Sequence, residues 1–125
     1  MLKQILLVGL GGGIGSVFRF LTSFYAAKYA VSGFPLGTFL VNVLGCFILG
    51  VAVGIFSKHP LGSENIRLLF ITGFCGGYTT FSTFASENMQ LLQQQNYTLL
   101  IIYTLASLLV GFLAIAIGLS LSRYW

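Results

Sequence analysis

Few side chains of this chain are suited to acid–base or metal chemistry. Its 125 residues include two acidic side chains, Glu64 and Glu87, together with one histidine and two cysteines. Paired-carboxylate catalysis and carboxylate-rich metal sites need more acids than this. Cys46 and Cys75 lie inside apolar stretches without CxxC spacing, so we interpret them as small buried hydrophobic residues. The sequence therefore predicts that the protein is not an enzyme.

The basic and glycine-rich features do not indicate a nucleotide or nucleic-acid partner. The run from Gly9 to Gly15 has no GxGxxG register, because Ile14 or Ser16 falls where the third glycine belongs. The formal charge of +4 comes from basic residues that are scattered rather than clustered, namely Lys3, Arg19, Lys28, Lys58, Arg67 and Arg123. We expect these charges to meet anionic lipid headgroups, and we expect no nucleic acid.

Two polar side chains within apolar stretches are better candidates for a functional site. An arginine at the centre of a membrane helix costs about 2.5–3.5 kcal/mol on insertion scales. Arg19 therefore either faces a polar vestibule or snorkels to the headgroups from near the end of its helix. Asn42 has apolar neighbours on both sides, and its amide needs hydrogen-bond partners. It is either glue between helices or a pore-lining donor.

Hydroxyl groups and aromatic ring edges add further donors that suit an anion. Tyr103 and Ser107 are one helical turn apart and share a face, although such hydroxyls often bond to carbonyls of their own helix. Phe81 and Phe84 can present the electropositive edges of their rings. The apolar spans offer no acid or histidine for proton coupling unless Glu87 lies deeper than its polar flank suggests. These residues favour passive permeation of an anion.

The elements that must position these residues are membrane helices. The chain is 57% hydrophobic and only 6% charged, against roughly 25% charged for an ordinary soluble domain. Lipid is the natural solvent for such a surface. A crossing helix needs about 20 mostly apolar residues. We therefore predict an all-α membrane protein, a single domain over residues 1–125 with spans at about 4–26, 36–57, 67–95 and 98–122.

The third span is expected to be broken near Gly76 to Thr80, where a glycine pair and several hydroxyl residues interrupt the apolar pattern. Unsatisfied backbone groups cost several kcal/mol in hydrocarbon, so a break must be covered by protein or line a polar cavity. An ion-binding break and a packing kink both remain open. Small residues at helix-packing spacing predict close helix contacts at Gly9 with Gly13, Gly11 with Gly15, Gly50 with Gly54 and Ser107 with Gly111.

Three segments of the chain resemble the small fluoride channels of the CrcB/Fluc type. These segments are Gly12–Phe20, Gly37–Phe47 and Gly73–Phe84, and the resemblance extends over essentially the whole chain in length and in number of spans. The last segment is the most specific, because a glycine pair, a threonine pair and two phenylalanines occur in fixed order over twelve positions.

The resemblance implies an antiparallel, dual-topology homodimer of four-helix subunits with two fluoride pores. It implies that the broken helices meet at the dimer centre around a structural sodium ion, held by the main-chain carbonyls of Gly76 and Thr79 from each subunit. The implied pore residues are Phe81 and Phe84 as ring-edge ligands, Asn42 as a pore-lining amide, and Tyr103 with Ser107 in a hydroxyl track.

We therefore expect a passive, fluoride-selective channel that spans the cell's inner membrane several times and exports cytoplasmic fluoride. A small proton-coupled exporter of lipophilic cations is the alternative, since it shares the length, the dimeric habit and the glycine-rich packing. It is disfavoured by the missing membrane carboxylate. In a third interpretation the protein is a structural membrane subunit whose polar residues only hold helices together.

The distribution of basic residues bears on dual topology. If the termini share a side with the loop between the second and third spans, that side carries Lys3, Lys58, Arg67 and Arg123, whereas the other carries Lys28 alone outside the spans. A positive-inside count then favours one orientation. Either some of these charges lie in vestibules, or one subunit of a dimer inserts against the bias.

Overall fold

The computed structural model describes residues 1–59 and 64–125, and every regular element in this part of the chain is a helix. The all-α prediction is therefore confirmed for these residues. The elements are α1 (Leu2–Ala26), η1 (Ala27–Tyr29), α2 (Leu36–Lys58), α3 (Glu64–Arg67), η2 (Leu68–Cys75), α4 (Gly76–Tyr78), α5 (Phe81–Gln93) and α6 (Tyr97–Ser122). Of these, η1 is a short 3-10 turn and η2 is wound as a π-helix.

Three helical segments within the described residues are long and apolar enough to cross a membrane: Leu2–Tyr29, Leu36–Lys58 and Tyr97–Ser122. At about 1.5 Å per residue, each exceeds a hydrocarbon core of about 30 Å. Large apolar side chains such as Ile5 and Leu109 are exposed on their surfaces. That distribution suits lipid as the surrounding solvent.

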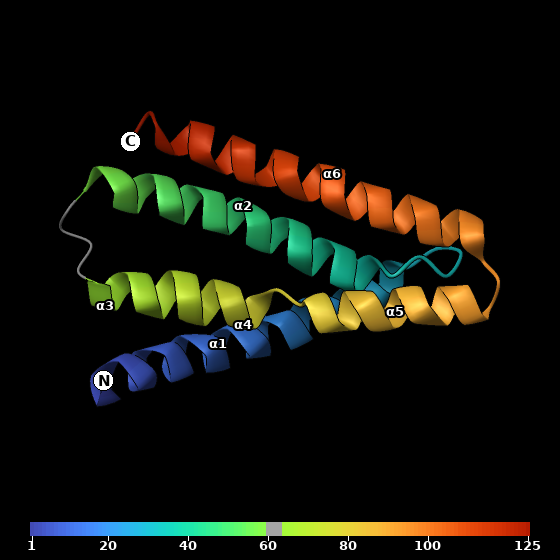
Figure 1. Ribbon diagram of the computed structural model, residues 1–125, viewed down its shortest axis with the longest axis horizontal. Helices are drawn as coiled ribbons and strands as arrows, with labels where there is room; N and C mark the ends of the chain where they lie inside the picture. The colour runs from blue at the N-terminus through green and yellow to red at the C-terminus, as the bar shows by residue number, and fades with distance from the viewer. Residues whose placement is uncertain (60–63) are drawn as a thin grey trace.

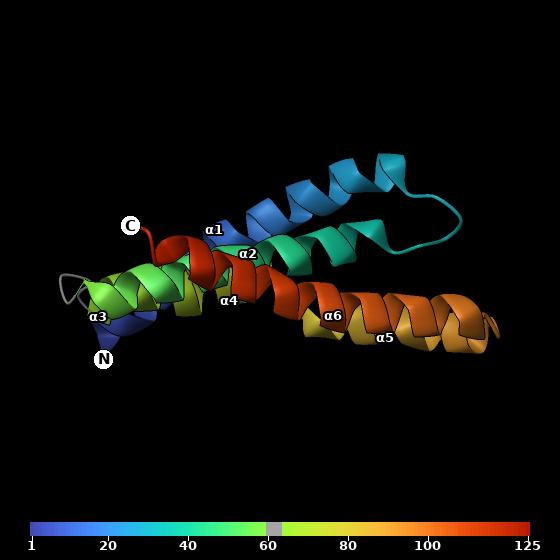
Figure 2. The same ribbon diagram turned by 90° about the horizontal axis from the view of Figure 1, so that it is seen from above.

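The helices run between the two ends of an elongated molecule (Figures 1 and 2). Both termini, the end of α2 and the start of α3 lie at one end, whereas η1, the end of α5 and the start of α6 lie at the other. The basic residues outside the spans divide accordingly. The end with the termini carries Lys3, Lys58, Arg67 and Arg123, and the opposite end carries Lys28. The charge asymmetry expected from the sequence is present in the folded chain.

Glycines allow α1 to approach η2 and α4 closely. Gly11 and Gly15 of α1 are buried, and a Cβ atom at either position would collide with a backbone carbonyl of η2. The prediction of close packing is therefore confirmed for this pair. It is wrong for Gly9 and Gly13 within the described chain, because a Cβ atom there would meet no atom within 4 Å. The two pairs point to different sides of the same helix.

The second close helix pair is α2 with α6, which lie side by side. Gly50 and Gly54 of α2 are buried, and added Cβ atoms would collide with Ile115 and Ser122 of α6. At the end with the termini, Lys58 Nζ donates to the carbonyl oxygen of Ser122 at 3.2 Å. This bond satisfies one of the terminal carbonyls of α6 and places a positive charge at the negative end of its dipole.

Candidate functional site

The segment from α3 to α5 is interrupted once, near the middle of the molecule (Figure 1). Thr79 (φ −81°, ψ 159°) and Thr80 (φ −149°, ψ 118°) have extended backbones, and α5 begins directly afterwards. The predicted break is confirmed, although it is narrower than expected, because Gly76 and Gly77 remain helical. The hydroxyl of Thr80 caps α5 by accepting from the N–H of Thr83 at 3.2 Å.

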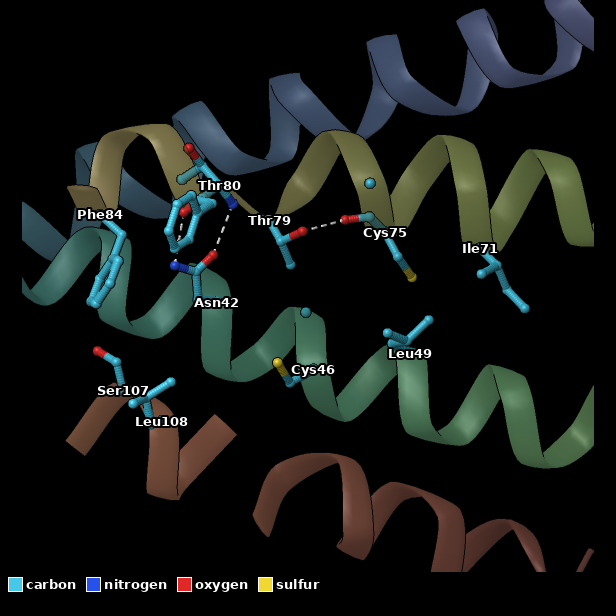
Figure 3. Close-up of a pocket in the computed structure, with 13 residues that line it drawn as sticks. Asn42, Cys46, Leu49, Ile71, Cys75, Thr79, Thr80, Phe84, Ser107 and Leu108 are labelled. Carbon is cyan, nitrogen blue, oxygen red and sulfur yellow. Dashed lines mark hydrogen bonds between the residues drawn. The ribbon is translucent and has the colours of Figure 1, made fainter. Parts of the chain in front are cut away.

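Asn42 of α2 satisfies the backbone of the break. Its Oδ1 accepts from the N–H of Thr80 at 2.8 Å, and its Nδ2 donates to the Thr80 carbonyl at 3.0 Å (Figure 3). In a continuous helix that N–H would bond to the carbonyl of Gly76. The amide therefore replaces a helical hydrogen bond at a residue that is only 8% exposed. Asn42 therefore holds α2 to the break by hydrogen bonds. Because an amide nitrogen carries two hydrogens, Nδ2 also keeps one further donor.

The two carbonyls expected to bind sodium have different surroundings. The carbonyl of Gly76 has lost its helical donor, since the N–H of Thr80 bonds to Asn42 instead. The carbonyl of Thr79 accepts from Arg19 Nη1 at 3.4 Å. Both residues line the same cavity. Main-chain oxygens are hard ligands that suit an alkali cation, but two oxygens do not complete a coordination shell, so a cation held by this pair would need further ligands.

Arg19 of α1 is half-buried and reaches across to the break. This contact turns the guanidinium toward the break, an arrangement compatible with the vestibule interpretation of Arg19. Within residues 1–59 and 64–125, the guanidinium makes this one side-chain hydrogen bond. A guanidinium has five N–H donors, so the break carries a positive charge with several donors to spare.

The two phenylalanines of the break motif differ in exposure. Their ring centroids lie 5.9 Å apart, but the Phe81 side chain is 79% exposed whereas Phe84 is half-buried. The Phe84 ring meets Tyr103 of α6 edge to face, with centroids 5.1 Å apart and ring planes at 64°. Phe84 therefore has a fixed place in the bundle, whereas Phe81 projects from the single chain.

Glu87 occupies the junction of three helices, a position that sequence reasoning assigned to a polar flank. Tyr103 donates its hydroxyl to Glu87 Oε2 at 3.0 Å, and Thr38 of α2 donates to Oε1. The acid is therefore held among α2, α5 and α6. A signal was available in the sequence, because Glu87 follows Phe84 by three residues and shares its helical face.

A cavity of about 470 Å³ opens beside the break. Among the predicted site residues, its walls include Asn42, Gly76, Thr79, Phe81, Phe84 and Ser107. Arg19 and Tyr103 do not line it. The Ser107 hydroxyl oxygen is buried and has no hydrogen-bond partner among the described residues. Cys46 and Cys75 are both free thiols in the cavity wall, as expected of unpaired cysteines.

Long apolar helices around an interrupted one define a multi-pass membrane protein with a cavity at the interruption. Broken helices that expose backbone groups at depth are typical of transport proteins. The family model described as CrcB-like protein, Camphor Resistance (CrcB), matches residues 6–119. The chain belongs to this CrcB family.

Three relatives illustrate how far the similarity extends, and each is named fluoride-specific ion channel FluC. The protein from Azobacteroides pseudotrichonymphae is 50% identical over 125 residues, covering 100% of both chains. The relative from Flavobacterium psychrophilum is 40% identical over 98% of both chains. The relative from Ignicoccus hospitalis is 39% identical over 98% of this chain and 97% of its own. The family comprises ion channels rather than enzymes.

Proposed function

We propose that the protein is a passive, fluoride-selective channel of the inner membrane that exports cytoplasmic fluoride. The observation that carries this proposal is the cavity at the break, where Asn42, Phe84 and Ser107 meet in a chain with relatives named fluoride channels. Fluoride is small and strongly hydrated, so a pore must replace water with other donors. The free Ser107 hydroxyl, the second amide hydrogen of Asn42 and the Phe84 ring edge are donors of this kind.

The proposal includes a fourth membrane crossing made of two half-helices. Residues 64–78 and 81–93 together extend between the same two ends of the molecule as the three long helices (Figures 1 and 2). The interruption at Thr79 and Thr80 is compatible with a crossing because Asn42 satisfies the backbone of Thr80. The pore is therefore expected near the middle of the bilayer.

An antiparallel homodimer with two pores is the assembly that we propose. The exposed Phe81 ring and the cavity beside it need a cover, and a second copy provides one. An inverted partner would also even out the charge, because each membrane face would receive one end rich in basic residues and one end poor in them. One of the two copies would then insert against the positive-inside bias.

A structural sodium ion at the centre of this dimer is part of the same proposal. The Gly76 and Thr79 carbonyls of two copies would supply four hard oxygen ligands. A bound sodium ion would supply a fixed positive charge next to the anion path. Replacing sodium by N-methylglucamine should lower the melting temperature of the purified dimer, and an unchanged melting temperature would contradict the site.

Proteoliposomes provide the test of the channel itself. Fluoride efflux followed with a fluoride-selective electrode should be rapid and should need no proton gradient, while chloride stays inside. Equal conduction of both anions, or none, would contradict the proposal. The same test addresses the alternative of a proton-coupled cation exporter, because the structure places the carboxylate of Glu87 among three helices. Uptake of an aromatic cation that requires a pH gradient would favour that exporter instead.

A further inference from the structure

The polar contacts of α5 carry an inference about how Phe84 is held in place. Among the residues of α5, all of which the structure describes, Leu91 alone is buried. The turn that carries Phe81 and Phe84 therefore has no buried apolar side chain to anchor it. Besides the contact of the half-buried Phe84 ring with Tyr103, hydrogen bonds to neighbouring helices hold this turn.

A chain of two hydrogen bonds links α6 to the backbone of Phe84. Thr104 Oγ1 of α6 donates to Asn88 Oδ1 at 3.1 Å, and Asn88 Nδ2 donates to the Phe84 carbonyl at 3.2 Å. Thr104 directly follows Tyr103, whose ring meets the ring of Phe84. Adjacent residues of α6 thus hold the ring and, through Asn88, the main chain of Phe84.

We propose that Asn88 and Thr104 are positioning residues that aim the ring edge of Phe84 at the anion path. This inference rests on the proposed function, in which that ring edge contacts fluoride. Glu87, the neighbour of Asn88, contacts two helices, because it accepts from Thr38 of α2 and from Tyr103 of α6. The link from Thr104 through Asn88 is uncharged, contacts α6 alone and is the one that reaches the main chain of Phe84.

The selectivity of a small-anion site depends strongly on where its donors lie. A displacement of about 1 Å from the productive geometry can cost on the order of 100-fold in a process that needs exact placement. Without the Thr104 hydroxyl, the Asn88 amide keeps only its bond within α5. The main chain of Phe84 then loses its link to Thr104, and the remaining ties to α6 are the two contacts with Tyr103, from the Phe84 ring and from Glu87. Fluoride flux should then fall, and chloride should be excluded less well.

The experiment compares three variants in proteoliposomes, scaled to the amount of assembled protein. Thr104→Val keeps the side-chain shape but removes the hydroxyl, and it should lower fluoride flux about tenfold and reduce the fluoride-to-chloride ratio. Thr104→Ser keeps the hydroxyl and should retain the fluoride flux and the fluoride-to-chloride ratio of the unmodified protein. Leu91→Ala is the matched control, because it removes the apolar anchor of α5 and should lower the melting temperature without changing the ratio.

The outcomes separate this inference from the proposed function. Absence of fluoride flux in the unmodified protein would contradict the function itself. If the unmodified protein conducts and Thr104→Val keeps its selectivity, the positioning role is refuted. Should Thr104→Val not assemble, Asn88→Ser replaces it, because the serine hydroxyl can still bond to the Phe84 carbonyl but is too short to reach Thr104. Unchanged selectivity in Asn88→Ser would equally overturn the inference.

Discussion

Replacing Asn42 with alanine should destabilise the protein strongly, because one amide satisfies both backbone groups of Thr80. The two bonds measure 2.8 and 3.0 Å, and Thr80 is only 8% exposed. An unsatisfied buried donor or acceptor costs about 1–3 kcal/mol. Losing both partners should therefore lower the free energy of unfolding by about 2–6 kcal/mol, with the lower figure applying if water enters the space left by the side chain.

Asn42→Asp distinguishes hydrogen bonding from simple loss of volume. An ionised aspartate can still accept from the N–H of Thr80, but it faces the Thr80 carbonyl with a second acceptor. Protonation at lower pH supplies an O–H group for that carbonyl and restores the pattern of the amide. Asn42→Asp should therefore regain stability as the pH falls, whereas Asn42→Ala should not.

In the assay, detergent-solubilised protein is heated and then passed over a size-exclusion column. The measured quantity is the temperature at which half of the protein no longer elutes as a single species. Asn96→Ala is the control, because the Asn96 side chain caps α6 at an exposed position with a bond of 3.3 Å to Leu99 N. That loss should cost about 1 kcal/mol. If Asn42→Ala is as stable as the unmodified protein yet does not conduct, Asn42 is a pore ligand only and the reasoning about the break is wrong.

Three further predictions follow from the packing and the site. Gly11→Ala should lower the melting temperature because its methyl group would collide with the backbone of η2, whereas Gly9→Ala should not, and equal melting temperatures would contradict the packing. Phe81→Ile and Phe84→Ile should keep the assembly but reduce fluoride flux, since the electropositive ring edge is lost while an apolar side chain is kept; normal flux would show that the rings only pack. Glu87→Gln should melt close to the unmodified protein, and Glu87→Leu should lose about 1–3 kcal/mol for each hydroxyl left unpaired; identical melting curves would refute this role.

The break was predictable from the sequence, but its exact position was not. The glycine pair and the hydroxyl run predicted an interruption near Gly76 to Thr80, and the structure confines it to Thr79 and Thr80. The difference has a physical reason, because a Cβ atom on Gly77 would collide with the backbone of Gly12 in α1. Gly77 therefore serves close packing of two helices rather than an unusual backbone conformation.

Contacts between distant segments explain what the sequence could not predict. The polar flank of Glu87 suggested that this acid lies away from the depth of the bundle, whereas the structure bonds it to Thr38, which lies 49 residues away in the chain. Arg19 is similar, since its partner Thr79 lies 60 residues away. Periodicity along one helix shows which residues share a face, but it does not show which neighbour that face meets.

The contacts of Glu87 distinguish the two hydroxyls predicted for the track. Its carboxyl group accepts from Thr38 and Tyr103. The Tyr103 hydroxyl is thus committed to this acid. Ser107, by contrast, lines the cavity together with Asn42, and its hydroxyl has no partner among the described residues. Of the two hydroxyls predicted for the track, Ser107 is therefore the one with a donor to offer, and the proposed fluoride path should follow the Asn42 and Ser107 side of the break.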